Sequence, residues 1–157
     1  MENKKLTVQR VITRCGCDKV LPLCIVYILY VILHGHLSPG GGFQGGILTV
    51  AVVLLVYFGH GYVATKHFFR ADLAHPTEAI ALIGYIVISV LGVIFGASFC
   101  YNFAYLNGDI GKLLSSGTIS WMDELVAANV VFGSIVLTTG ILSVLFPQDV
   151  DNTREVE

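Results

Sequence analysis

Residues 20–64 read VLPLCIVYILYVILHGHL, then SPGGGFQ, then GGILTVAVVLLVYFGHGYVA. A helix needs about 20 predominantly apolar residues to cross the hydrocarbon core of a bilayer, and each outer run is about that long. The central run combines a proline, which stops a helix, with three consecutive glycines, which allow a sharp change of chain direction. The stretch therefore predicts two membrane-spanning helices joined by a tight glycine-rich turn.

Composition places the rest of the chain in a membrane as well. Of the 157 residues, 55% are hydrophobic and only 13% are charged, whereas a soluble domain carries about 25% charged residues. Backbone groups in lipid must pair within their own segment, so the long apolar runs are helices. We predict an all-α integral membrane protein with four transmembrane helices in one domain, residues 1–157. The expected helices are residues 20–37, 45–64, 79–101 and 125–146, with a flexible tail at 147–157.

The basic residues predict the orientation. Eight of the nine lysines and arginines lie before the first helix, in the second loop or in the tail, and only Lys112 lies on the other side. By the positive-inside rule, both termini and the second loop face the cytoplasm.

Local signals predict where two helices begin. Thr77 is placed to cap the third helix after Pro76, with Glu78 favoured by the helix dipole. Residues 120–123 have the spacing of a capping box before the fourth helix, and Pro147 ends that helix.

Two apparent motifs carry no chemistry. Gly40, Gly42 and Gly45 match the dinucleotide fingerprint G-x-G-x-x-G, but a membrane helix precedes them where the fingerprint needs a strand. Cys15-x-Cys17 is too tight for a paired metal-ligand spacing, and no second cluster completes a site. We expect no catalytic residue, no metal and no cofactor in this chain.

Small residues recur at the spacing that lets helices approach closely. The pairs Gly41/Gly45, Gly42/Gly46 and Gly92/Gly96 each have the small-xxx-small form. Four helices cannot bury so many bare faces internally, so we expect other membrane subunits to pack against them. A re-entrant, water-lined element is the alternative interpretation of the turn.

The turn also resembles a known family signature. Gly35-His36-x-x-Pro39-Gly40-Gly41-Gly42-Phe43-x-Gly45-Gly46 is similar to the motif of the MnhB subunit of Mrp-type multisubunit sodium/proton antiporters. Equivalent subunits occur in archaeal membrane-bound hydrogenases and related sulfur-reducing complexes. The resemblance implies a small, non-catalytic subunit in a prokaryotic cell membrane, packed in a hetero-oligomeric complex that transports sodium ions and protons. His36, as part of the motif, is expected to form a hydrogen bond into the turn.

Few ionisable residues lie in the predicted helices. Asp123 and Glu124, at the start of the fourth helix, are candidates for the ion path, because carboxylates are the natural ligands of hard cations. The alternative is a helix-capping pair favoured by the dipole. Glu78 is open to the same two interpretations. Four polar residues of the fourth helix are expected to make interhelical hydrogen bonds: Asn129, Ser134, Thr138 and Thr139.

Three functions remain open on the sequence alone. The first is a subunit of an antiporter module, either standing alone or joined to a redox arm such as a hydrogenase. The second is a structural or assembly subunit with no residue on the ion path. The third, a transporter that acts alone, is disfavoured because the helix interiors contain no complete proton relay.

Overall fold

The computed structural model describes residues 2–37, 40–95, 98–104 and 116–145, with side chains described from residue 11 onward. Across these residues the chain forms helices and no strand. The helices are α1 (Glu2–Leu33), α2 (Gly42–Phe68), α3 (Ala71–Ile94) and α4 (Thr118–Leu145). Each contains a segment long and apolar enough to cross a bilayer. The predicted all-α fold with four membrane-spanning helices is confirmed.

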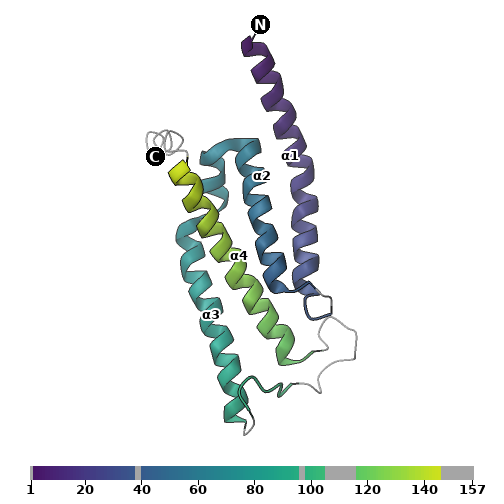
Figure 1. Ribbon diagram of the computed structural model, residues 1–157, viewed down its shortest axis with the longest axis vertical. Helices are drawn as coiled ribbons and strands as arrows, with labels where there is room; N and C mark the ends of the chain where they lie inside the picture. The colour runs from purple at the N-terminus through teal and green to yellow at the C-terminus, as the bar shows by residue number, and fades with distance from the viewer. Residues whose placement is uncertain (1, 38–39, 96–97, 105–115, 146–157) are drawn as a thin grey trace.

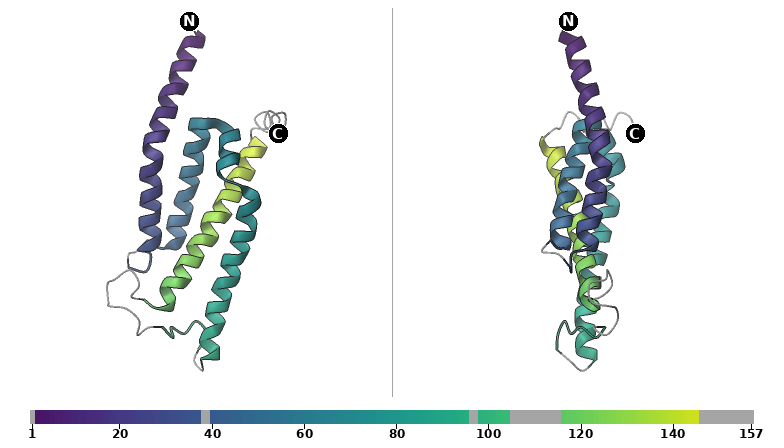
Figure 2. Two further views of the ribbon diagram at one scale, coloured as in Figure 1. Left: turned by 180° about the vertical axis from the view of Figure 1, so that it is seen from behind. Right: turned by 90° about the vertical axis from the view of Figure 1, so that its right-hand side faces the viewer.

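The four helices lie in a single row instead of a closed bundle. α1 packs on α2, α2 packs on α4, and α4 packs on α3, while α1 and α4 make only slight contact. Figure 1 shows the row face on, and the right-hand view of Figure 2 shows that it is thin from the side. Large apolar side chains therefore remain exposed on both faces, among them Leu23, Ile94 and Val144. Lipid or other membrane subunits must cover these two broad faces.

The buried part of the row is centred on α2. Val52, Val53 and Val56 of this helix are buried, and Val53 packs in a cluster with Ala74, Ile135 and Leu142. These contacts bring residues of α2, α3 and α4 together in the part of the protein nearest the connection between α2 and α3. Small and β-branched side chains dominate the contacts, as is typical of helix packing in membranes.

α2 is kinked near this end. Gly61 interrupts the helical backbone with φ +83°. Residues other than glycine rarely adopt this backbone conformation. Thr65 donates a hydrogen bond through Oγ1 to the Gly61 carbonyl oxygen at 2.9 Å. After the kink, the last turns of α2 run across one end of the four helices toward the start of α3 (Figure 1).

The third helix begins earlier and ends earlier than predicted. It starts at Ala71, so Pro76 lies inside it, and the predicted N-cap at Thr77 is wrong. Thr77 instead donates through Oγ1 to the Leu73 carbonyl oxygen, one turn back, at 2.7 Å. Pro76 is the sixth residue of the helix and lacks the N–H that would bond to the carbonyl oxygen four residues back, so the helix continues with one backbone hydrogen bond fewer. The helix ends at Ile94 and not at residue 101.

The fourth helix also begins earlier, at Thr118, so the predicted capping box at residues 120–123 is wrong. Its first turn is held by Asn102, whose Oδ1 accepts hydrogen bonds from the backbone nitrogen and Oγ1 of Thr118, both at 2.9 Å. The cap is supplied from another segment, which local spacing cannot reveal. α1 ends at Leu33 and not at residue 37. Several predictions concern parts outside the described residues: Pro39, Gly96, Pro147 and the tail at 147–157.

Candidate functional site

The carboxylate of Asp123 reaches from α4 into the glycine-rich turn. Its Oδ1 accepts a hydrogen bond from the backbone nitrogen of Gly42, the first residue of α2, at 3.0 Å. The preceding residue, Gly41, has no side chain that could cap the helix. Asp123 therefore takes the place of an N-cap, and its negative charge lies at the positive end of the α2 dipole.

The glycines of the turn leave room for this carboxylate. A methyl group on Gly35 would collide with Asp123 Oδ2, and one on Gly41 would lie 3.6 Å from Oδ1. A methyl group on Gly42 would contact the Asp123 carbonyl oxygen and lie 2.9 Å from Ala127 Cβ. The glycine run thus fits around one acidic side chain from a distant part of the sequence.

Three ionisable residues meet at this point, and we call His36, Asp123 and Glu124 the turn cluster. Asp123 Oδ2 and His36 Nε2 are buried without a hydrogen-bond partner within the described part of the chain. Glu124 follows Asp123 on α4 and lies within electrostatic range of both Asp123 and His36. Buried polar atoms are normally paired, so the two unpaired atoms mark a place where a cation, a proton or water would be stabilised.

The hydrogen bond expected from His36 into the turn is not made through Nε2, which has no partner among the described residues. The neighbouring His34 is held instead by α1. Its Nδ1 lies 3.0 Å from the Tyr30 carbonyl oxygen, and its ring stacks on that of Tyr30 with centroids 4.4 Å apart. The two histidines therefore lie in different surroundings.

Gly42, Gly45 and Gly46, which we call the glycine ridge of α2, pack against α4 and α1 of this chain. The sequence predicts a partner subunit at this face instead. A methyl group on Gly46 would lie 2.6 Å from Val130 Cβ of α4, and one on Gly45 would collide with Ile32 of α1. Gly92 faces the turn after α3, with Tyr101 N at 2.6 Å from such a methyl group. Gly42, Gly45 and Gly46 lie at close contacts between helices of this chain, but small-residue spacing alone does not say which helix occupies such a face.

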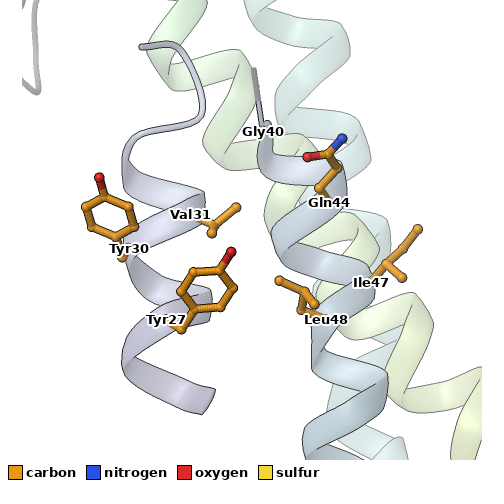
Figure 3. A pocket seen from close by; sticks show the side chains of 7 residues that line it. All are labelled: Tyr27, Tyr30, Val31, Gly40, Gln44, Ile47 and Leu48. Carbon is orange, nitrogen blue, oxygen red and sulfur yellow. The ribbon is translucent and has the colours of Figure 1, made fainter. Parts of the chain in front are cut away.

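The residues between the ridge glycines point outward. Phe43 and Gln44 are exposed. Figure 3 shows Gln44 at the edge of a groove between α1 and α2, opposite Tyr27 and Tyr30. The groove has a volume of about 530 Å³ and is lined mostly by apolar atoms. Its shape suits an apolar chain or side chain, with the Gln44 amide and the two tyrosines as its polar groups.

Glu78 is a second intramembrane carboxylate, and it lies deeper than its predicted place at a helix start. Because α3 starts at Ala71, Glu78 lies two turns inside the helix and packs against α4. A methyl group on Gly133 would lie 3.1 Å from Glu78 Oε1. Asn129 donates through Nδ2 to the Glu78 carbonyl oxygen at 3.2 Å. Residues 71–78 read ADLAHPTE and are not an apolar run, so hydropathy does not reveal this position.

The polar residues of α4 divide into two groups. Asn129 bonds to α3, and Ser134 bonds through Oγ to the Gly46 carbonyl oxygen of α2 at 3.3 Å, which confirms two predicted interhelical hydrogen bonds. Among the residues that the structure describes, Thr138 and Thr139 bond only to carbonyl oxygens of α4 itself, so the prediction of interhelical hydrogen bonds is wrong for them. No group of three histidine, cysteine, aspartate or glutamate side chains within the described ranges is placed to hold a metal ion.

The family model and the named relatives that match this chain point to the same family. Residues 12–146 match a family described as a domain related to the MnhB subunit of Na+/H+ antiporter. An uncharacterized protein of Methanocaldococcus jannaschii is 29% identical over 116 residues, which are 71% of this chain and 44% of that protein, so the match spans less than half of its length. The B subunit of the Na+/H+ antiporter of Bacillus subtilis is 28% identical over 100 residues, 62% of this chain and 69% of that protein. Its counterpart in Alkalihalophilus pseudofirmus is 40% identical over 37 residues, about a quarter of each chain.

Proposed function

The chain belongs to the MnhB family, and from that premise we propose that it is a non-catalytic membrane subunit of a multisubunit sodium/proton antiporter module. The match covers α2, α3 and α4 in full and α1 from residue 12 onward. The two bacterial relatives, both named as B subunits of Na+/H+ antiporters, support the same assignment. The other membrane subunits of the module would cover the exposed faces of the helix row.

One observation carries the proposed role on the ion path. Asp123 Oδ2 is buried and, within the described residues, unpaired at the glycine-rich turn, next to the second acid Glu124. An ionisable group inside a membrane span is costly, and such groups mark ion or proton pathways. Oδ1 is occupied by Gly42, so Oδ2 is the atom of this side chain available to a passing cation, whose other ligands would come from water or partner subunits.

The test is the double replacement Asp123→Asn with Glu124→Gln in the intact complex. Both amides keep the shape of the acids, and the new amide oxygen at position 123 can still accept the hydrogen bond from Gly42. We expect the complex to co-purify with unchanged composition while sodium-dependent proton efflux from membrane vesicles falls several-fold. Asp72→Asn, an exposed acid in the first turn of α3, is the matched control and should leave exchange unchanged.

A structural subunit with no residue on the ion path is the second candidate. The hydrogen bond between Asp123 and Gly42 favours it, because that contact alone explains why an acid stands at this position. Unchanged sodium/proton exchange in an assembled complex carrying both replacements would leave this candidate and remove the first.

The proposal extends to the setting of the complex. The module stands alone or is joined to a redox arm such as a membrane-bound hydrogenase, and adjacent genes for nickel–iron hydrogenase subunits would select the joined form. The archaeal and bacterial sources of the relatives support a position in a prokaryotic cell membrane, and the basic residues around the termini support an orientation with both termini in the cytoplasm. Cysteine-labelling at residues 2 and 157 from each side of the membrane would test that orientation.

A further inference from the structure

Glu78 lies in the seam between α3 and α4, in a part of the chain that the proposed ion site does not include. Its carboxylate packs against Gly133, and within the described residues no side chain or backbone nitrogen donates a hydrogen bond to it. Asn129 of α4 uses its amide nitrogen for the Glu78 carbonyl oxygen instead. A carboxylate at membrane depth without a donor or a counter-charge is expensive.

A pocket lies about one helical turn from Glu78 along α3, and we call it the terminal pocket. It lies at the end of the helices where α2 leads into α3, has a volume of about 270 Å³ and is lined mostly by apolar atoms, with five polar side chains from three helices in its wall: Tyr62, Lys66, His75, Thr139 and Ser143. His75 stands three residues before Glu78, about 4.5 Å along the α3 axis. Val136, which also lines the pocket, stands three residues after Gly133 on α4.

The surroundings suit a proton better than a metal cation. Hard cations take about six or more oxygen ligands. The seam offers the two Glu78 oxygens and the Asn129 amide oxygen. The titratable groups on neighbouring elements are Tyr62 and Lys66 of α2, His75 of α3, and Asp123 and Glu124 of α4. Glu124 is nine residues from Gly133, or about 13.5 Å along the helix, so it does not reach Glu78 directly.

We propose that Glu78 is a proton-carrying carboxyl of the α3–α4 seam, and that the terminal pocket connects it to water on the side of the chain termini. A hydronium ion in the pocket gives its proton to a Glu78 carboxylate oxygen and leaves as water, and the reverse step returns the proton. The role in exchange rests on the proposed antiporter function, whereas protonation of Glu78 in the membrane does not.

The first test is chemical labelling of the intact complex in its membrane with dicyclohexylcarbodiimide. This apolar reagent reacts with a protonated carboxyl: the acid oxygen bonds to the central carbon of the reagent while the acid proton moves to a nitrogen. We expect mass spectrometry to find the modification on Glu78, and to find it lost in Glu78→Gln. Asp72 lies exposed on the same helix and should remain unmodified.

The second test is sodium-dependent proton exchange in vesicles with the same complexes. We expect loss of exchange in Glu78→Gln and partial recovery in Glu78→Asp, which keeps a carboxyl. Either of two results overturns the proposal: Glu78 unmodified in the wild-type complex, or Glu78→Gln exchanging as fast as wild type. A Glu78→Gln complex that fails to assemble also counts against it, because an amide of the same shape preserves the packing. Labelling of Glu78 in a wild-type complex that shows no exchange would refute the antiporter function alone.

Discussion

Asp123 and Glu78 are both carboxylates that lie where glycine leaves space on a neighbouring segment, yet their surroundings differ. Asp123 fits against Gly35 and Gly41 and receives the backbone nitrogen of Gly42 at the positive end of α2. Glu78 fits against Gly133 and receives no hydrogen bond from the described residues. The first carboxylate is fixed by the fold, and the second is held in place by packing alone. The space that a glycine leaves for a carboxylate therefore does not by itself tell what the carboxylate does. The difference between the two residues is that Asp123 has a hydrogen-bond donor.

The largest effect that would test this comparison is expected at Gly42, on the Asp123 side. In Gly42→Ala the new methyl group meets the Asp123 carbonyl oxygen and Ala127, both on the backbone or Cβ of α4, so α2 and α4 must separate. We expect a loss of about 1–3 kcal/mol in the free energy of unfolding, measured by denaturation of the purified protein in detergent. Gly140→Ala is the matched control, because nothing lies within 4 Å of its added methyl group.

Removing the acid itself should have the next largest effect. Asp123→Ala leaves the Gly42 nitrogen without an acceptor at the buried start of α2 and should cost about 0.5–2 kcal/mol of stability. Asp123→Asn retains an acceptor, so its unfolding free energy should lie much closer to wild type. Equal losses in the two variants would show that the charge, and not the hydrogen bond, holds the turn.

A smaller effect is expected in the α3–α4 seam. Asn129→Ala removes the hydrogen bond to the Glu78 carbonyl oxygen, and interhelical hydrogen bonds in membranes contribute about 0.6 kcal/mol on average. Denaturation in detergent should show a loss of that size. A loss as large as that of Asp123→Ala would mean that the seam is fixed as firmly as the turn.

The smallest change in stability should come from Gly133→Ala. This variant distinguishes most clearly between the surroundings of Asp123 and those of Glu78. The added methyl group would lie 3.1 Å from Glu78 Oε1, the end of a flexible side chain that can move aside. We expect a change within about 0.5 kcal/mol, together with a changed rate of carbodiimide labelling at Glu78. Labelling that stays at the wild-type rate would show that Gly133 does not position the carboxyl.

Hydropathy and length predict the number and type of helices correctly, since a bilayer requires long apolar segments whatever their packing. The site is predicted less completely. The sequence singles out Asp123, but its bond to Gly42 joins residues 81 positions apart, and no local pattern encodes such a contact. Treating Pro76 as a helix start places Glu78 too near the helix end. Residues 71–78 include Asp72, His75 and Pro76, so neither apolar length nor helix-start signals reveal that the helix begins at Ala71.

The single row of helices has a consequence for communication between subunits. A wall one helix thick is only about 10 Å across, so a side chain in one of its seams is within reach of groups on either side. Subunits on opposite faces of this single layer would be kept apart by it. A charge on a side chain within the layer would still interact electrostatically with groups on both faces. A closed four-helix bundle of the same sequence length would hide such a group from every neighbour.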